Sequence, residues 1–177
     1  MGCSQTLSAI AKDCLGSLGG IKRVLLANAD DVTGVTLTDS IITAITMGSG
    51  KVFYEYQFRA NTGSLTSNYQ VPDTGASPYV QTDLVMAFNR METAKRVSII
   101  ALAQADLVGI VEDMNGKYWY LGYDNPLRLS AGAALSGQQR SDRNGYDVTL
   151  VDESRELPYE VNAGIIAGLL SGGAVNQ

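Results

Sequence analysis

The chain has 177 residues, of which 45% are apolar and 18% are charged, so it has the length of one domain and enough apolar material for a core. It contains no histidine, which excludes Ser-His-Asp and Cys-His catalysis and imidazole ligation of a metal. A net charge of −5 argues against tight binding to a nucleic-acid backbone, because such binding depends on clustered lysine and arginine.

The cysteine content and the hydropathy of the chain indicate where in the cell the protein is expected to be. The only cysteines, Cys3 and Cys14, both lie in the first segment, so the chain is no disulfide scaffold and an intracellular origin fits best. The longest apolar runs, such as 97–103, fall far short of the roughly 20 residues that span a bilayer. No secretion signal opens the chain. We therefore expect a globular, soluble protein with no membrane span.

The first third of the chain predicts an arm followed by strands. Residues 1–20 are expected to form an N-terminal arm that ends at a pair of glycines. Apolar and β-branched residues at 21–27, 35–37 and 41–46 predict the first strands. From 52 to 58, apolar and aromatic residues alternate with others, which predicts a strand with one wholly apolar face.

Residues 59–78 are rich in Asn, Thr, Ser, Gly, Asp and Pro. This composition predicts a long polar loop with one modest β stretch around 65–71. A loop of this length in a compact domain usually binds something or moves.

A strand with alternating apolar residues is predicted at 79–88, followed by a helix at about 90–104. Asn89 is the expected cap, with Glu92 completing a capping box and pairing with Arg96. The helix is apolar nearly all round from 97 to 103, so we expect a sheet or a neighbour on most of its sides.

The clearest hairpin joins 107–113 to 117–123 through Asn115-Gly116, a pair that favours a type I′ turn. A polar connection at 131–145, a strand at 146–151 and a short segment at 157–161 follow. The predicted fold is therefore mainly β: an antiparallel β-sandwich or partly closed barrel with one flanking helix. Residues 21–162 form the single domain, and 163–177 form an apolar, glycine-rich C-terminal arm.

Catalytic and ligand-binding motifs are weak. Gly48-Ser49-Gly50-Lys51 lacks the first glycine and the Ser/Thr of a phosphate loop, and the acid pairs Glu112-Asp113 and Asp152-Glu153 lie at strand ends, where charges are common. We expect no enzyme, no metal and no cofactor. Met1 to Thr6 matches the myristoylation pattern, with Cys3 as a second acylation site. This match keeps a lipid-anchored binding module open as an alternative to a simple arm.

The order of elements between 79 and 161 carries a resemblance. A strand ending in MAFNR precedes a helix with ETAKR and LAQA, then LVGIVEDMNGKYWYLGYDNPL and DRNGYDVTLVDESRELPYEV. This run resembles tail tube proteins of phages and prophages of Bacteroidetes-like hosts, which are similar in design to type VI secretion inner-tube proteins. The resemblance implies hexameric rings that stack into a hollow tube through which DNA passes.

A non-catalytic virion tail protein would be assembled in the bacterial host cytoplasm, with copies of itself and other tail proteins as partners, transient DNA passage and no membrane contact. The alternative within this class is a capsid decoration or head-to-tail connector protein. Apart from the resemblance, several strands could pack on both faces and the chain has an arm at each end. It therefore has more surface suited to contacts between subunits than a monomer requires.

Two sets of residues are candidates within this hypothesis. The loop is expected to contact the next ring, whereas acidic side chains on polar strand faces are expected to line the channel, because they do not retain DNA. The inter-ring candidates are Arg59, Asn61, Leu65, Tyr69, Val71 and Pro72, and the channel candidates are Glu55, Asp83 and Asp147.

Overall fold

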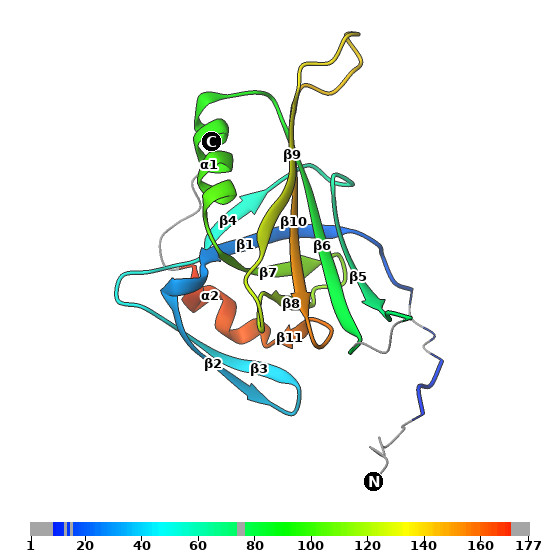
Figure 1. Ribbon diagram of the computed structural model, residues 1–177, viewed down its shortest axis with the longest axis vertical. Helices are drawn as coiled ribbons and strands as arrows, with labels where there is room; N and C mark the ends of the chain where they lie inside the picture. Colours follow the sequence, from blue (N-terminus) through cyan, green and yellow to red (C-terminus); the bar gives the residue numbers. More distant parts are fainter. Residues whose placement is uncertain (1–8, 13, 15, 74–76, 171–177) are drawn as a thin grey trace.

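The computed structural model of the chain describes residues 9–12, 14, 16–73 and 77–170 (Figure 1). Its strands are β1 (Ile21–Asn28), β2 (Val32–Thr38), β3 (Ile41–Met47), β4 (Tyr54–Gln57), β5 (Gly63–Gln70), β6 (Tyr79–Asn89), β7 (Leu107–Asp113), β8 (Tyr118–Leu121), β9 (Arg128–Leu135), β10 (Gly145–Ser154) and β11 (Tyr159–Val161). The helices are α1 (Thr93–Gln104) and α2 (Ile166–Leu169).

The strands form two sheets that pack face to face. One has seven strands in the order β2-β3-β11-β8-β7-β1-β4, and the other has four in the order β5-β6-β10-β9. Neighbouring strands are antiparallel except for β11 and β3, which run parallel. Of the described residues, 50% are strand and 14% helix, and they form no closed barrel, so the predicted β-sandwich with a flanking helix is confirmed.

The core lies between the sheets and continues behind the larger one. Val24 and Leu26 of β1 face Leu84 and Met86 of β6 across the sandwich. The alternate residues of β1 and β7 enter a second cluster, which α2 covers with Ile166 and Leu169. Because β1 and β7 are buried on both faces, their sequences are runs of apolar residues without alternation.

The two-residue turn predicted between β7 and β8 is wrong in type. Asn115 does not have a positive φ, whereas Gly116 has φ 78°, and the Gly116 amide donates to the Asp113 carbonyl at 3.2 Å. This is a three-residue loop with glycine in the left-handed position. The turn with two left-handed residues instead joins β2 to β3 through Asp39 and Ser40, whose φ values are 50° and 64°.

Helix α1 begins later than predicted and is packed on one side only. Asn89 ends β6, and Glu92 is the residue before the helix, with its carboxylate paired to Arg90 and Lys95 rather than to Arg96. The left-handed φ of 67° at Arg90 turns the chain sharply, so Asn89 cannot cap the helix. Leu102 is the one buried residue among the helix positions, so within its own subunit α1 is covered on one side only, and cover of the other sides by a neighbour stays a prediction.

Two segments predicted as polar connections contain more strand than expected, and the modest β stretch predicted at 65–71 in the first of them corresponds to β5. Residues 63–70 form β5, which pairs with β6 along its whole length, so the expected loop at 59–78 consists of a turn, a strand and a connection. Likewise, β9 occupies most of the first half of the segment 131–145 and pairs with β10. Both strands contain few large apolar residues, because the core covers only part of the inner face of each strand.

The strand predicted at 52–58 is shorter than expected. It contributes the four residues of β4 at the edge of the larger sheet. The predicted apolar face does turn toward the core between the sheets, because Tyr56 and Phe58 pack there, although Tyr54 is 59% exposed. Phe53, just before the strand, is buried behind the sheet.

The ends of the chain differ from each other. The described residues of 9–20 are exposed, and the Leu18 amide donates to the Asn115 side chain at 2.9 Å. The expected C-terminal arm instead folds onto the sheet as far as residue 170, and the Phe53 amide donates to the Leu169 carbonyl at 3.0 Å. Its last residues, 171–177, and the acylation pattern Met1–Thr6 lie outside the described part. Within the described part, no helix is long and apolar enough to cross a membrane.

Candidate assembly surface

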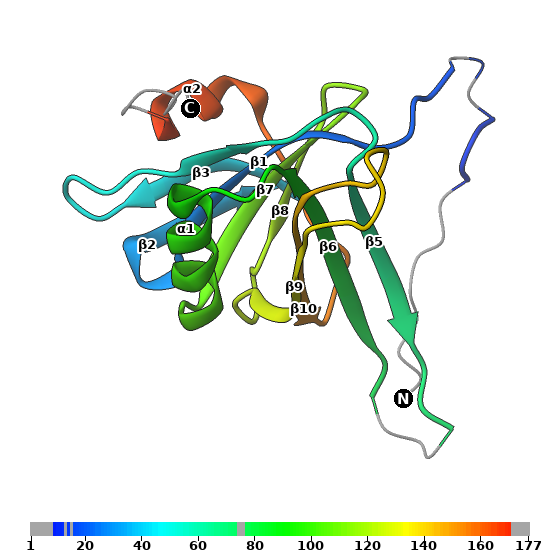
Figure 2. The same ribbon diagram turned by 90° about the horizontal axis from the view of Figure 1, so that it is seen from above.

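The structure divides the inter-ring candidates between two ends of a strand. Arg59 and Asn61 precede β5, whereas Val71 and Pro72 follow it, and eight strand residues place the two pairs about 25 Å apart. Leu65 lies on the inner face of β5 against the core. The candidates that share one end are therefore Tyr69, Val71 and Pro72, beside the outer end of the β5–β6 hairpin (Figure 2).

Two of the three channel candidates lie on one surface. Asp83 of β6 and Asp147 of β10 alternate with buried residues, so both point away from the core on the outer face of the four-stranded sheet. Glu55 does not join them. It lies on β4 of the other sheet, where its carboxylate is bound by Arg23 Nη1 at 2.9 Å.

The outer face of the four-stranded sheet is polar. Ser64, Thr66 and Asn68 of β5 lie opposite Val85, Asp83 and Gln81 of β6. On β10 the same face adds Thr149, Val151 and Glu153. Two arginines lie at this face: Arg143 is bound to Asp147, and Arg128, opposite Val151 on β9, is bound to Asp106. Both arginines are thus paired with carboxylates, and there is no aromatic side chain at these positions.

Both edges of the four-stranded sheet lack the usual protection against pairing. Within the described residues, β5 and β9 each pair with one strand only, so each leaves one edge open. Strand β5 contains no charged residue, and β9 contains none after Arg128. Natural proteins block open edges with lysine, proline or inward-pointing charge. These edges are suited to pairing with another chain.

Helix α1 lies beside β9 (Figure 1). Apolar residues on its outer side are exposed. Ile99 and Leu102 face the core with Leu129, whereas Val97 is 57% and Ile100 is 42% exposed. The helix carries no charged residue after Arg96. The outer side of α1 and the edge of the neighbouring β9 both lack charged residues, and we refer to residues 97–104 and 129–135 as the assembly surface.

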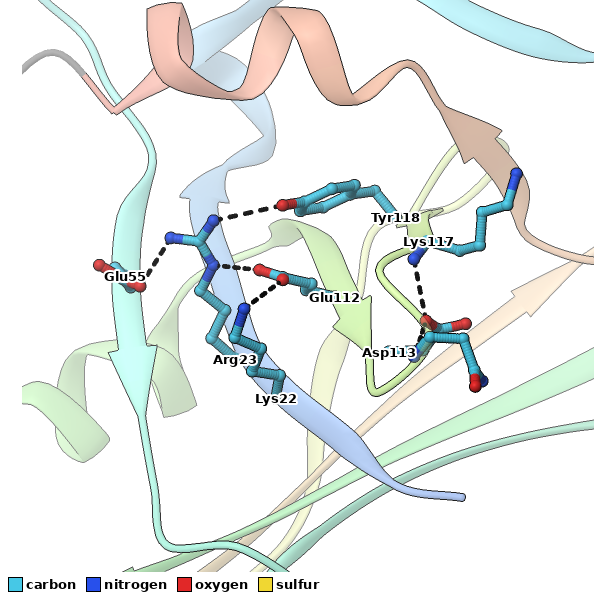
Figure 3. Close-up of polar contacts among 8 residues, drawn as sticks. Lys22, Arg23, Glu55, Glu112, Asp113, Lys117 and Tyr118 are labelled. Atoms are coloured by element: carbon cyan, nitrogen blue, oxygen red, sulfur yellow. Dashed lines mark hydrogen bonds and ion pairs between the residues drawn. The ribbon is translucent and has the colours of Figure 1, made fainter. Parts of the chain in front are cut away.

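The densest group of charged side chains surrounds Arg23 on the far face of the larger sheet (Figure 3). A bulge between Ile21 and Arg23 lets both Lys22 and Arg23 reach Glu112 of β7. Lys22 Nζ lies 2.8 Å from Glu112 Oε1, and Arg23 Nε binds the other carboxylate oxygen. Arg23 also donates to Glu55 and, at 3.4 Å, to the Tyr118 hydroxyl.

This group fixes β4 to β1 and β7. Burial alone would raise the pKa of Glu112, but the hydrogen bonds from Lys22 and Arg23 outweigh it and hold that pKa below its ordinary value. Each charge is matched by a partner, so no group is left free to bind a substrate.

We expect Glu112→Gln to lower the free energy of unfolding by about 3 kcal/mol at pH 7, because it leaves the partly buried Arg23 without its main partner. Because the pKa of Glu112 is lower in the folded protein than its ordinary value near 4.5, the ionised carboxylate stabilises the fold at pH values above 4.5. This stabilisation is lost as the pH falls through the folded-state pKa. Urea unfolding at pH 7 and at pH 3 measures both effects. Glu153→Gln, at an exposed position, is the control, and an equal loss at both pH values would contradict the linkage.

A buried carboxyl group, that of Asp152, lies at one end of the sandwich. Asp152 is 3% exposed and accepts hydrogen bonds from the Gly122 amide at 2.7 Å and from the Ser154 hydroxyl. Burial raises the pKa of Asp152, and the charges of Asp124 and Glu153 add to this effect. The adjacent cavity of about 10 Å³ has room for about one water molecule. Asp152 therefore anchors the β8–β9 connection to β10.

Sequence reasoning missed the uncharged edge of β9, although its signal is the run of small residues at 129–135. In the part of the chain that the structure describes, no group of three acidic or cysteine side chains is placed to hold a metal ion. Comparison of the chain with models of protein families, with curated proteins and with solved structures gives no match.

Proposed function

We propose that the chain is a virion structural protein of the tail tube type, which assembles into rings, hexameric by resemblance, that stack into a hollow tube. The observation that carries this proposal is the assembly surface: an uncharged sheet edge next to an uncovered apolar helix face. A protein that stays monomeric rarely exposes both together.

The open edges suggest how a ring would form. If β9 of one subunit pairs with β5 of the next, the four-stranded sheets join into one continuous sheet, and closure of the ring removes every open edge of that sheet. Helix α1 lies next to β9, so a neighbouring subunit that pairs with β9 and extends over α1 would cover Val97 and Ile100.

The exposed face of such a sheet supports the passage of DNA. Its acidic residues, Asp83, Asp147 and Glu153, and its Ser, Thr, Asn and Gln side chains would line the channel. Lysine and arginine would retain phosphates through counterion release, whereas carboxylates repel them. The absence of catalytic activity stays a prediction of this proposal.

Light scattering coupled to size-exclusion chromatography tests the proposal. We expect the mass to rise well above the 18.8 kDa of one chain as the concentration increases. A single species of monomer mass at every concentration would contradict it. A discrete dimer or trimer that never stacks would favour a decoration or connector protein.

A further inference from the structure

A loop projects from one end of the four-stranded sheet. Residues 136–144, between β9 and β10, extend beyond the body of the subunit (Figure 1). The Asp142 carboxylate accepts hydrogen bonds from the Gln138 and Gln139 amides at 2.9 and 2.8 Å, and the Asp142 amide donates to the Gln139 carbonyl at 3.0 Å. These bonds hold the exposed loop in one shape, which lowers the entropy that binding would cost.

The tip of this loop presents one free positive charge. Asp142 is occupied by the backbone amides, and Arg143 is bound to Asp147. Arg140 is exposed and makes no ion pair with any residue that the structure describes. The loop thus offers a guanidinium group to a partner.

A shallow groove, open to solvent over most of its extent, lies beyond the other end of β10. Tyr69, Trp119 and Tyr159 form part of its wall, together with the aliphatic Ile41 and Leu157. The groove also contains three carboxylates, from Asp39, Glu156 and Glu160. Its aromatic and acidic lining suits an arginine side chain.

The carboxylates of the groove are not all neutralised. Glu160 is paired with Lys117 at 2.5 Å. Glu156 accepts a hydrogen bond from the Tyr159 hydroxyl, which leaves its charge in place. Asp39 forms no ion pair within the described residues. The groove therefore has a negative charge, opposite to that of the loop.

Loop and groove face opposite ends of the subunit. The loop immediately precedes Gly145, and the groove residues 156–160 follow Ser154, so the whole of β10 separates them by about 30 Å. Two such surfaces cannot meet within one chain. When a projection and its complement lie at opposite ends of the same subunit, they can make a head-to-tail contact, which continues as an open stack unless its rotation closes into a ring.

We propose that loop 136–144 of one subunit inserts into the groove of a second copy of this chain, with Arg140 facing Glu156 and Asp39. The inference rests on the proposed function and identifies the contact between successive rings. It also accounts for Tyr69, the inter-ring candidate that lines the groove.

Charge reversal at each side tests this contact. Arg140→Glu and Glu156→Arg should each raise the concentration needed for stacking by at least about tenfold, because like charges would meet. Mixing the two variants, or combining both changes in one chain, should restore stacking, since opposite charges again face each other. Sedimentation velocity measures stacking, and circular dichroism confirms that each variant is folded. Arg140→Gln, which removes the charge without reversing it, should give a smaller effect in the same direction.

Glu153→Arg is the matched control, because Glu153 is exposed near the same end of β10 but lies outside the groove. If the single variants stack like the wild type, or if their mixture is not restored, the loop and groove do not meet and the inference is overturned. This result differs from failure of the proposed function, in which the wild type would form no rings at all.

Discussion

Replacing Val97 and Ile100 together by glutamate should abolish ring formation and leave the folded subunit intact. Both side chains are largely exposed in the subunit, so the double variant should change its free energy of unfolding by no more than about 1 kcal/mol. In a ring the same positions would be covered, and burial of two unpaired carboxylates costs several kcal/mol. The assembly equilibrium should therefore shift by more than about a hundredfold.

Sedimentation velocity and thermal unfolding measure these two effects separately. Met114→Glu is the control, because Met114 is also exposed and lies in the β7–β8 turn, outside the assembly surface. If the Val97 and Ile100 variant assembles as the wild type does, the outer side of α1 is not covered in the assembly.

The second large effect concerns the channel. Asp83→Lys combined with Glu153→Lys should leave assembly nearly unchanged, because both side chains point away from the core and from the sheet edges. The four-unit change in charge per subunit, from two carboxylates to two ammonium groups, should slow DNA release in an infection assay severalfold. Asp147 is left in place, because it holds Arg143.

Salt and a neutral variant make this test specific. Added salt should weaken the defect, since the retention depends on counterion release. Asp83→Asn with Glu153→Gln removes the negative charges without adding positive ones and should release DNA almost normally. Unchanged release by the lysine variant would mean that this face does not line the channel.

Strands with a strong local pattern could be predicted from the sequence, whereas those with a weak pattern could be predicted only in part or not at all. The alternation in β6 and the apolar runs of β1 and β7 locate those strands, because their buried faces require such residues. Strand β5 has only a weak pattern, which predicted a modest β stretch at 65–71, and β9 has none. Their polar and small residues become strands only because β6 and β10 offer edges to pair with, and this pairing is tertiary.

The same limit applies to the candidate residues. Alternation places Asp83 on the exposed face of its strand, but it does not say to which sheet a strand belongs. Glu55 was therefore grouped with Asp83, whereas Arg23, 32 residues earlier, holds it on the other sheet. The groove could not be predicted at all, because its walls come from separate segments around Ile41, Tyr69, Trp119 and residues 156–160.

Electron microscopy of the purified protein at high concentration tests the central claim most directly. The proposed assembly predicts rings with a central hole in end views and regularly striped tubes in side views. The four-stranded sheets should form the inner wall, with Asp83 and Glu153 facing the channel. A field of separate monomers without rings or tubes would contradict the account, as would a channel lined mainly by lysine and arginine.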